Sequence, residues 1–195
     1  MELGIPTHHL GINKLLNLPE KVITLWKLLK EEKQDIVQTW MYHSDLLGGV
    51  VSKIIGVPTI WSIHNSNLDK NFTKNSTRLA VHFCAKVSKW VPSKILCCSS
   101  VSKDMHIDYG YESQKMVVIP NGIDTDLFKP NKDHRISLLK ELKLGEDTRL
   151  IGFFARYDPQ KDHQTFVKMA SIIKRRIPNV FFVLCGNQID WNNGK

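Results

Sequence analysis

Short apolar runs alternate with segments of helical periodicity along most of the chain, and this alternation restricts the possible folds more than any other feature. The apolar runs have the length of strands in globular proteins. They lie at 35–40, 59–63, 95–98, 116–119, 150–154 and 180–184. A chain that alternates such strands with helices folds as parallel sheets covered by helices on both faces, so we expect an α/β fold.

Helix signals occupy the segments between these runs. Pro19 suits a first helical turn, and Ser44 or Asp45 could cap the next helix, which Gly56 would end. Further helices are expected at 75–89, from 99 onward, at 136–142 and at 162–176. Trp26, Trp40 and Trp61 fall in these helices and strands, where we expect them to pack in the core.

The composition is that of a packed protein. Of 195 residues, 42% are hydrophobic and 24% are charged, which excludes collagen-like and disordered chains. No apolar run approaches the length of a membrane-spanning helix, and no secretory signal is visible at the start. The four cysteines are too few and too irregular for a disulfide framework, so we expect buried free thiols and a cytoplasmic location. They are Cys84, Cys97, Cys98 and Cys185.

The charge is strongly basic. The chain has 27 Lys and Arg against 19 Asp and Glu, a formal net charge of +8. Such a surplus attracts polyanions, whether nucleic acid, anionic lipid or a diphosphate. The densest cluster, Lys174 to Arg176, lies at the end of an expected helix, where cations complement the helix dipole. No nucleic-acid-binding signature accompanies the charge, so no nucleic-acid partner is expected.

The apolar pattern divides the chain into two parts. It weakens at 124–147, which we interpret as an interdomain linker with one short helix. We therefore expect a first domain at 1–123 and the start of a second at 148–195. Two strands and one helix cannot bury a doubly wound core alone, so the second domain is expected to be incomplete, and the first to lack its beginning.

Polar residues follow each expected strand. In open α/β sheets, ligands bind beyond the carboxyl ends of the strands, so these segments are the candidate site. They are 41–45, 64–67, 99–102, 120–124, 155–161 and 186–187. Two of their residues, Arg156 and Lys161, combine a planar fork of donors with a point charge, a pair that suits a diphosphate.

Three strings resemble the retaining glycosyltransferases of family 4. They are His64-Asn65 after an apolar strand, Val118 to Asp124 followed by Phe128, and Arg156 to His163. The segment 38–45 is also similar to members that work on bacterial surface polysaccharides. The resemblance covers nearly the whole chain. It implies the GT-B fold, in which two Rossmann-like parallel-sheet domains face each other, with the acceptor mostly on the first and a UDP- or GDP-sugar on the second.

The resemblance also implies roles for individual residues. Arg156 and Lys161 would bind the donor diphosphate and neutralise charge on the leaving phosphate, and His64 would reach the transferred sugar. Gly186 would allow close approach of the nucleotide. Other residues would shape the cleft or hinge, namely Tyr42, His43, Asn65, Asn121, Gly122 and Asp124. No metal and no further cofactor are implied, because the two cations do the work of a divalent ion.

The implied reaction is retaining hexosyl transfer to a saccharide or lipid-linked acceptor in surface polysaccharide biosynthesis. The basic balance would suit peripheral contact with an anionic membrane at its inner face. The chain lacks two family elements, an N-terminal glycine-rich loop and a C-terminal Glu-x₇-Glu element. We therefore expect residues 1–195 alone to have negligible transferase activity.

Two alternatives stay open. A sugar-nucleotide epimerase of the same fold would also use a diphosphate cleft, but it would need acidic residues near the sugar, and no acidic pair follows the expected strands. An inactive fragment or a non-catalytic binding module would instead bind polyanions in a manner independent of Arg156 and Lys161.

Overall fold

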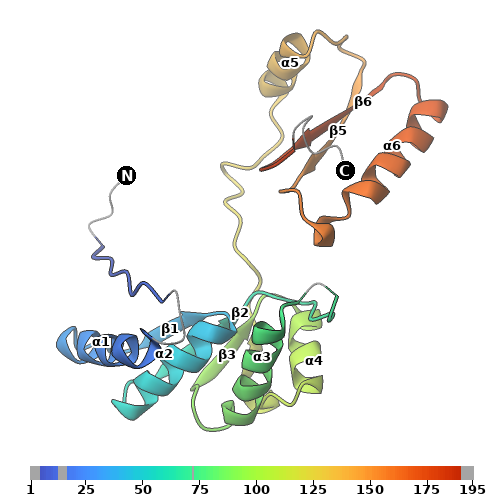
Figure 1. The fold of residues 1–195 in the computed structure, drawn as a ribbon. Coiled ribbons are helices and arrows are strands. Elements are labelled where there is room, and N and C mark those ends of the chain that lie inside the picture. Colours follow the sequence, from blue (N-terminus) through green and yellow to red (C-terminus); the bar gives the residue numbers. More distant parts are fainter. Residues whose placement is uncertain (1–4, 13–16, 72, 190–195) are drawn as a thin grey trace. The chain divides into compact units, whose positions relative to one another are not determined.

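The computed structural model describes residues 5–12, 17–71 and 73–189, and the chain divides into two compact units. The first unit is Met1–Gly122 and the second is Ile123–Lys195 (Figure 1). Each unit contains a sheet in which all strands are parallel, as the alternation predicts. The expected α/β class is therefore confirmed.

The first unit is built on a four-stranded sheet with the order β1-β2-β3-β4. Its elements, in chain order, are α1 (Leu18–Glu31), β1 (Val37–Trp40), α2 (Tyr42–Ile54), β2 (Thr59–Ile63), α3 (Asn75–Val87), β3 (Lys94–Cys97), α4 (Ser100–Asp108) and β4 (Met116–Val118). The register pairs Thr39 with Trp61, Trp61 with Ile95, and Ile95 with Met116. These in-line residues share one face of the sheet.

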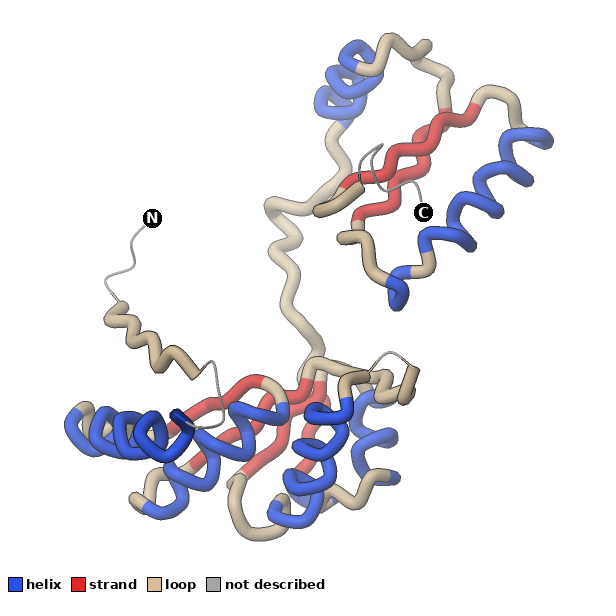
Figure 2. The backbone as a smooth tube through the Cα atoms, viewed as in Figure 1, coloured by secondary structure: helices blue, strands red, loops and turns tan. Residues whose placement is uncertain are grey.

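In the part of the first unit that the structure describes, helices cover only this face of the sheet (Figure 2). The sequence predicts helices on both faces. The reason is the strand order. Each crossover moves one strand in the same direction, and right-handed crossovers then place α2, α3 and α4 on the same side. Trp40 lies on the other face and is 53% exposed, so its expected core position is wrong.

The core of the first unit lies between this face and the helices. The fully buried side chains of Trp61, Ile63 and Ile95 pack against Val81 and Cys84 of α3. Trp61 also meets Tyr111 edge-on, with 6.5 Å between ring centroids. The expectation of buried thiols holds for two of the four cysteines: Cys84 and Cys97 are buried, whereas Cys98 is half-buried and Cys185 is exposed.

The second unit contains a two-stranded parallel sheet. Its elements are α5 (Lys132–Glu141), β5 (Arg149–Phe154), a 3₁₀ turn (Pro159–Lys161), α6 (His163–Arg176) and β6 (Val180–Cys185). Phe166 of α6 stacks on Phe153 of β5, with 4.7 Å between ring centroids. Helix α5 begins four residues before the expected Ile136, because the Asn131 side chain accepts hydrogen bonds from the backbone N–H groups of Asp133 and His134.

Helix α2 also begins earlier than expected. Its first residue is Tyr42, and neither Ser44 nor Asp45 caps it. Asp45 is instead fully buried, where its Oδ1 accepts a 2.5 Å hydrogen bond from the Thr39 hydroxyl. Its Oδ2 has no partner among the described residues. Burial raises the pKa of this carboxyl to about 7, although the hydrogen bond from Thr39 opposes the shift.

Replacing Asp45 by Asn is expected to remove a pH dependence from the stability of the first unit. Because the folded pKa is raised to about 7, the folded state keeps a proton that the unfolded chain releases near its ordinary value of 3.8. Stability therefore falls as the pH rises between these two values, by at most about 1.4 kcal/mol per pH unit. Above the folded pKa the loss is complete and the curve is level.

Denaturant unfolding of the natural chain and of Asp45→Asn at about pH 5 and about pH 8 measures this effect. The free energy of unfolding gained by the substitution should be larger at the higher pH. Asp104→Asn, which alters an exposed carboxyl on α4, is the control and should show the same difference at both values. An equal gain from Asp45→Asn at both pH values would contradict the shifted pKa.

Gly49→Ala tests how closely α2 approaches the sheet. A methyl group at Gly49 would overlap Nε1 of Trp61. Alanine normally stabilises a helix interior by about 1 kcal/mol relative to glycine, but overpacking of a core costs about 1–3 kcal/mol. We expect the cost of overpacking to exceed the gain in helix propensity, so the melting temperature should fall. Gly122→Ala, where an added methyl meets nothing within 4 Å, is the matched control and should leave it unchanged.

Candidate functional site

The carboxyl end of the first sheet joins the segments that follow β1 and β2. The Met41 N–H donates to the Ser62 carbonyl at 3.0 Å, and the His64 N–H donates to Sδ of Met41 at 3.5 Å. Met41 has a φ of 66° and a ψ of 160°, a conformation that costs a residue with a side chain about 1–3 kcal/mol. This strained residue turns the chain from β1 directly into α2.

Tyr42 is buried rather than placed at the surface of a cleft. Its hydroxyl lies 3.0 Å from Nε2 of His106. Nδ1 of His106 lies 2.7 Å from the Ser102 carbonyl, which can only accept, so Nδ1 carries the proton and Nε2 accepts from Tyr42. Burial lowers the pKa of His106 and keeps the ring neutral, which this arrangement requires.

The same network reaches the segment after β2. The Ser102 hydroxyl donates to the Asn65 carbonyl at 2.6 Å, so α4 holds the backbone beside His64. Asn65 Oδ1 accepts from the Asn67 N–H at 3.0 Å, and two further Asx turns continue the loop to Asn71. The alternation of Asn and Asp at 65, 67 and 69 is the sequence signal for these turns.

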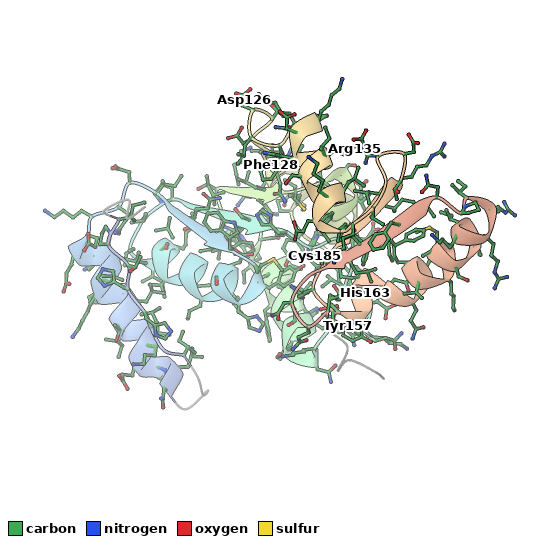
Figure 3. The ribbon with its side chains drawn as sticks, turned by 90° about the horizontal axis from the view of Figure 1, so that it is seen from above. Asp126, Phe128, Arg135, Tyr157, His163 and Cys185 are labelled. Carbon is green, nitrogen blue, oxygen red and sulfur yellow. The ribbon has the colours of Figure 1, made fainter. Side chains whose placement is uncertain are left out.

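His43 and His64 are both exposed, and they follow the neighbouring strands β1 and β2. Asn121 and Gly122 are exposed at the end of the first unit. Asp124 is the second residue of the second unit, and its Oδ1 accepts from the N–H groups of Asp126 and Leu127, both at 3.0 Å. Asp126 and Phe128 are labelled in Figure 3.

The carboxyl end of the second sheet carries the two expected phosphate-binding cations. The Ala155 N–H donates to the Cys185 carbonyl at 3.0 Å, and the Tyr157 N–H donates to the Asn187 carbonyl at 2.9 Å. These bonds tie the segment after β5 to the segment after β6. Gly186 lies between them, and a methyl group there would overlap the Ala155 carbonyl. The sheet itself thus requires this glycine.

Arg156 is held by a carboxylate two residues away. Its Nε and Nη2 lie 3.2 and 3.1 Å from Oδ2 of Asp158, and its side chain is 67% exposed. The Gln160 N–H and the Arg156 guanidinium lower the pKa of Asp158 below its usual range, so the carboxylate stays charged. The remaining guanidinium N–H groups have no partner among the described residues and could contact an anion, and Lys161, also exposed, ends the 3₁₀ turn in the same segment.

Helix α6 begins directly after this segment. Asp162 adopts a φ of 51° and accepts from the Thr165 N–H at 3.2 Å, which caps the helix. The N-terminus of a helix carries partial positive charge and unpaired N–H groups. The segment after β5 therefore contains two exposed side-chain cations and ends at a helix N-terminus.

A shallow depression of about 270 Å³ lies beside the loop, lined by Tyr157, Asp158, Pro159, Asp162, His163 and Gln164. Tyr157 and His163 are labelled in Figure 3. The His163 ring is buried between Phe153 and Tyr157, at centroid distances of 5.0 and 5.3 Å. Neither of its nitrogens has a partner among the described residues. The position of His163 after the strand does not predict this burial, because it depends on aromatic neighbours that come together only in the folded chain.

No group of three or more His, Cys, Asp and Glu side chains within residues 5–12, 17–71 and 73–189 could hold a metal ion. Over the same residues, no helix is long and apolar enough to span a membrane.

Solved structures with the same fold include Anabaena Alr3699/HepE in complexes with UDP and glucose and with UDP-glucose. In the first, the TM-score is 0.69 at 20% identity, with 92% of this chain and 45% of that chain covered. For the complex with UDP-glucose, the TM-score is 0.65 at 18% identity, with 89% of this chain and 54% of that chain covered. This likeness confirms the expected fold of GT-B type.

Curated relatives are glycosyltransferases. The chain is 27% identical over 186 residues to a UDP-Gal:alpha-D-GlcNAc-diphosphoundecaprenol alpha-1,3-galactosyltransferase of Escherichia coli, covering 94% of this chain and 48% of the relative. It is 24% identical over 149 residues to the putative glycosyltransferase EpsF of Bacillus subtilis, covering 74% of this chain and 39% of that relative. The chain thus spans less than half the length of these relatives.

The family model of Glycosyltransferase Family 4 matches residues 4–127, which is well over half of the chain. That stretch contains the strained turn at Met41, the His64–Asn65 loop and the Asn121–Gly122 segment. The chain belongs to glycosyltransferase family 4.

Proposed function

We propose that the protein takes part in transfer of a hexose from a UDP- or GDP-sugar to a saccharide or lipid-linked acceptor, with retention of configuration, in the biosynthesis of a bacterial surface polysaccharide. The observation that carries this proposal is the loop after β5. It brings Arg156 and Lys161 to the carboxyl end of a parallel sheet, next to the N-terminus of α6. In open α/β sheets that end is where nucleotide ligands bind.

The donor diphosphate would lie on this loop. Arg156 would contact a phosphate oxygen through the N–H groups that Asp158 does not use, and Lys161 would add a second positive charge. As the bond to the sugar breaks, negative charge grows on the leaving diphosphate. Preorganised donors aimed at such charge contribute about 3 kcal/mol each to the transition state. Two side-chain cations would then replace the divalent ion that other transferases use.

The acceptor side would be the first unit. His64 follows β2, and its backbone is held by Met41, while the neighbouring Asn65 carbonyl is held by Ser102. A ring on such a fixed backbone is suited to positioning a sugar. The E. coli relative acts on an acceptor whose sugar is carried by diphosphoundecaprenol and forms an alpha linkage. Both features support a lipid-linked acceptor and retention here. Four free cysteines support a reducing, cytoplasmic location.

Loss of either cation is expected to weaken UDP binding. Arg156→Ala and Lys161→Ala should each raise the dissociation constant of UDP about tenfold or more, because a hydrogen bond to a charged group contributes ~1.5–3 kcal/mol. Titration calorimetry on the 195-residue chain measures this effect. Lys168→Ala removes an exposed cation from α6 in the same unit and should leave the constant unchanged. UDP binding that survives both substitutions would contradict the proposed donor site.

The product of the reaction tests the remaining parts of the proposal. UDP-galactose and a GlcNAc-diphosphoundecaprenol acceptor are incubated with residues 1–195, for which only trace transfer is expected, and the linkage of any product is read by NMR spectroscopy. An alpha-linked galactose supports retention, and a beta linkage contradicts it. Conversion of the donor by C2 epimerisation, with no sugar transferred, would instead support the epimerase alternative.

A further inference from the structure

The positive charge of the chain is concentrated in one segment. Residues 70–103 contain seven Lys and Arg residues and no Asp or Glu, so they supply +7 of the formal +8. The seven are Lys70, Lys74, Arg78, Lys86, Lys89, Lys94 and Lys103. Helix α3 and the turn after it occupy the middle of this segment (Figure 1). The acidic residues resume at Asp104 on α4.

Helix α3 has two different faces. Ala80, Val81, Cys84 and Ala85 are buried against the sheet and α2. On the opposite side, Leu79 is 58% exposed and Phe83 is 45% exposed. These two lie four residues apart, so they are neighbours on the helix surface. Arg78 and Lys86 flank them and are exposed as well.

Trp90 adds the largest exposed apolar side chain of this region. It is 65% exposed in the turn directly after α3. The turn is well ordered by hydrogen bonds: the Trp90 N–H donates to the Val87 carbonyl at 3.0 Å, and Nζ of Lys115 donates to the Pro92 carbonyl at 2.7 Å. The indole is therefore held at the surface by a fixed backbone, not by a loose end.

We propose that this face, which we call the α3 surface (Arg78, Leu79, Phe83, Lys86, Lys89 and Trp90), docks on an anionic lipid bilayer. Single exposed apolar residues are ordinary, but Leu79 and Phe83 are neighbours on the outer side of α3, Trp90 is exposed in the turn that follows, and cations lie between them along the chain, a combination suited to a bilayer interface. Lys and Arg are attracted to anionic headgroups, and Trp is enriched where an apolar and a polar phase meet. The charge of the segment thus fits a bilayer surface.

The partner is a bilayer and not a nucleic acid because of what lies between the cations. Phe83 and Trp90 have π faces on which a base could stack, but Leu79 has none, and an exposed aliphatic side chain beside them gains more from an apolar lipid phase than from a nucleic acid. The proposal does not depend on the donor site, since Arg156 and Lys161 belong to the second unit and lipid binding requires no sugar transfer.

Vesicle sedimentation tests the charge. With vesicles of roughly equal parts phosphatidylglycerol and phosphatidylcholine, the triple variant Arg78→Gln, Lys86→Gln, Lys89→Gln should bind about tenfold or more weakly than the natural chain. The matched control is Lys168→Gln, Arg175→Gln, Arg176→Gln, which removes three exposed cations from α6, including part of its basic end. It should keep most of the binding. Added salt should weaken binding of the natural chain.

Fluorescence tests the orientation. Brominated lipids quench an indole that enters the interface, so they should quench the natural chain, and Trp90→Phe should remove most of that quenching. Leu79→Ser with Phe83→Ser should weaken vesicle binding while thermal unfolding remains cooperative, because both side chains are exposed. UDP binding should be unaffected by all of these changes, which separates this proposal from the proposed function.

Several results would overturn the proposal. Equal binding to pure phosphatidylcholine would show that charge is not involved, and an equal loss in the α6 control would show that the α3 surface is not special. Absence of vesicle binding would exclude the bilayer as the partner. Binding to single-stranded RNA that is lost on the same three substitutions, with no binding to vesicles, would assign the surface to nucleic acid instead.

Discussion

Parallel pairing of neighbouring strands is the constraint on which the candidate site depends. Because every strand in each sheet runs in the same direction, every segment that follows a strand begins at the same edge. Hydrogen bonds then hold these segments at the edge: Met41 bonds to Ser62 of β2 and His64 to Met41 in the first unit, and Ala155 bonds to Cys185 of β6 and Tyr157 to Asn187 in the second. Polar residues that are far apart in the sequence become neighbours as a result. At Gly186 the two segments lie so close that a methyl group would overlap the Ala155 carbonyl.

Buried polar groups fix the first of these edges more firmly than apolar packing alone could. Inside the core, His106 forms hydrogen bonds with the hydroxyl of Tyr42 and the carbonyl of Ser102. The Ser102 hydroxyl donates in turn to the Asn65 carbonyl, which fixes the backbone of the loop after β2. A partly satisfied network would be costly in such surroundings. Asp45 shows that cost: one of its oxygens is bound to Thr39 and the other has no partner within the described part of the chain, and burial raises its pKa to about 7.

The sequence predicts what depends on neighbours along the chain, and it fails where the cause is tertiary. The strands are apolar runs bounded by turns, so their positions follow from pattern alone. Asp45 has the right type and place for a helix cap, but the contact with Thr39 draws it into the core. Trp40 would pack in a sheet covered on both faces, and it is exposed because the strand order places the helices on one face. The burial of His163 likewise depends on two aromatic rings that no spacing rule brings together.

The charges of the β5–α6 loop show that geometry matters more than net charge at the candidate donor site. Between residues 156 and 162 the loop contains two cations, Arg156 and Lys161, and two carboxylates, Asp158 and Asp162, so its formal charge is zero. Both carboxylates, however, are occupied by the protein: Asp158 orients Arg156 and accepts from the Gln160 N–H, and Asp162 caps α6. Asp158 fixes Arg156 and Asp162 fixes the start of α6, while Lys161 and the side chain of Arg156 stay exposed. A diphosphate would meet preorganised donors without first drawing them into position, which is the arrangement that favours a charge formed during the reaction over one already present.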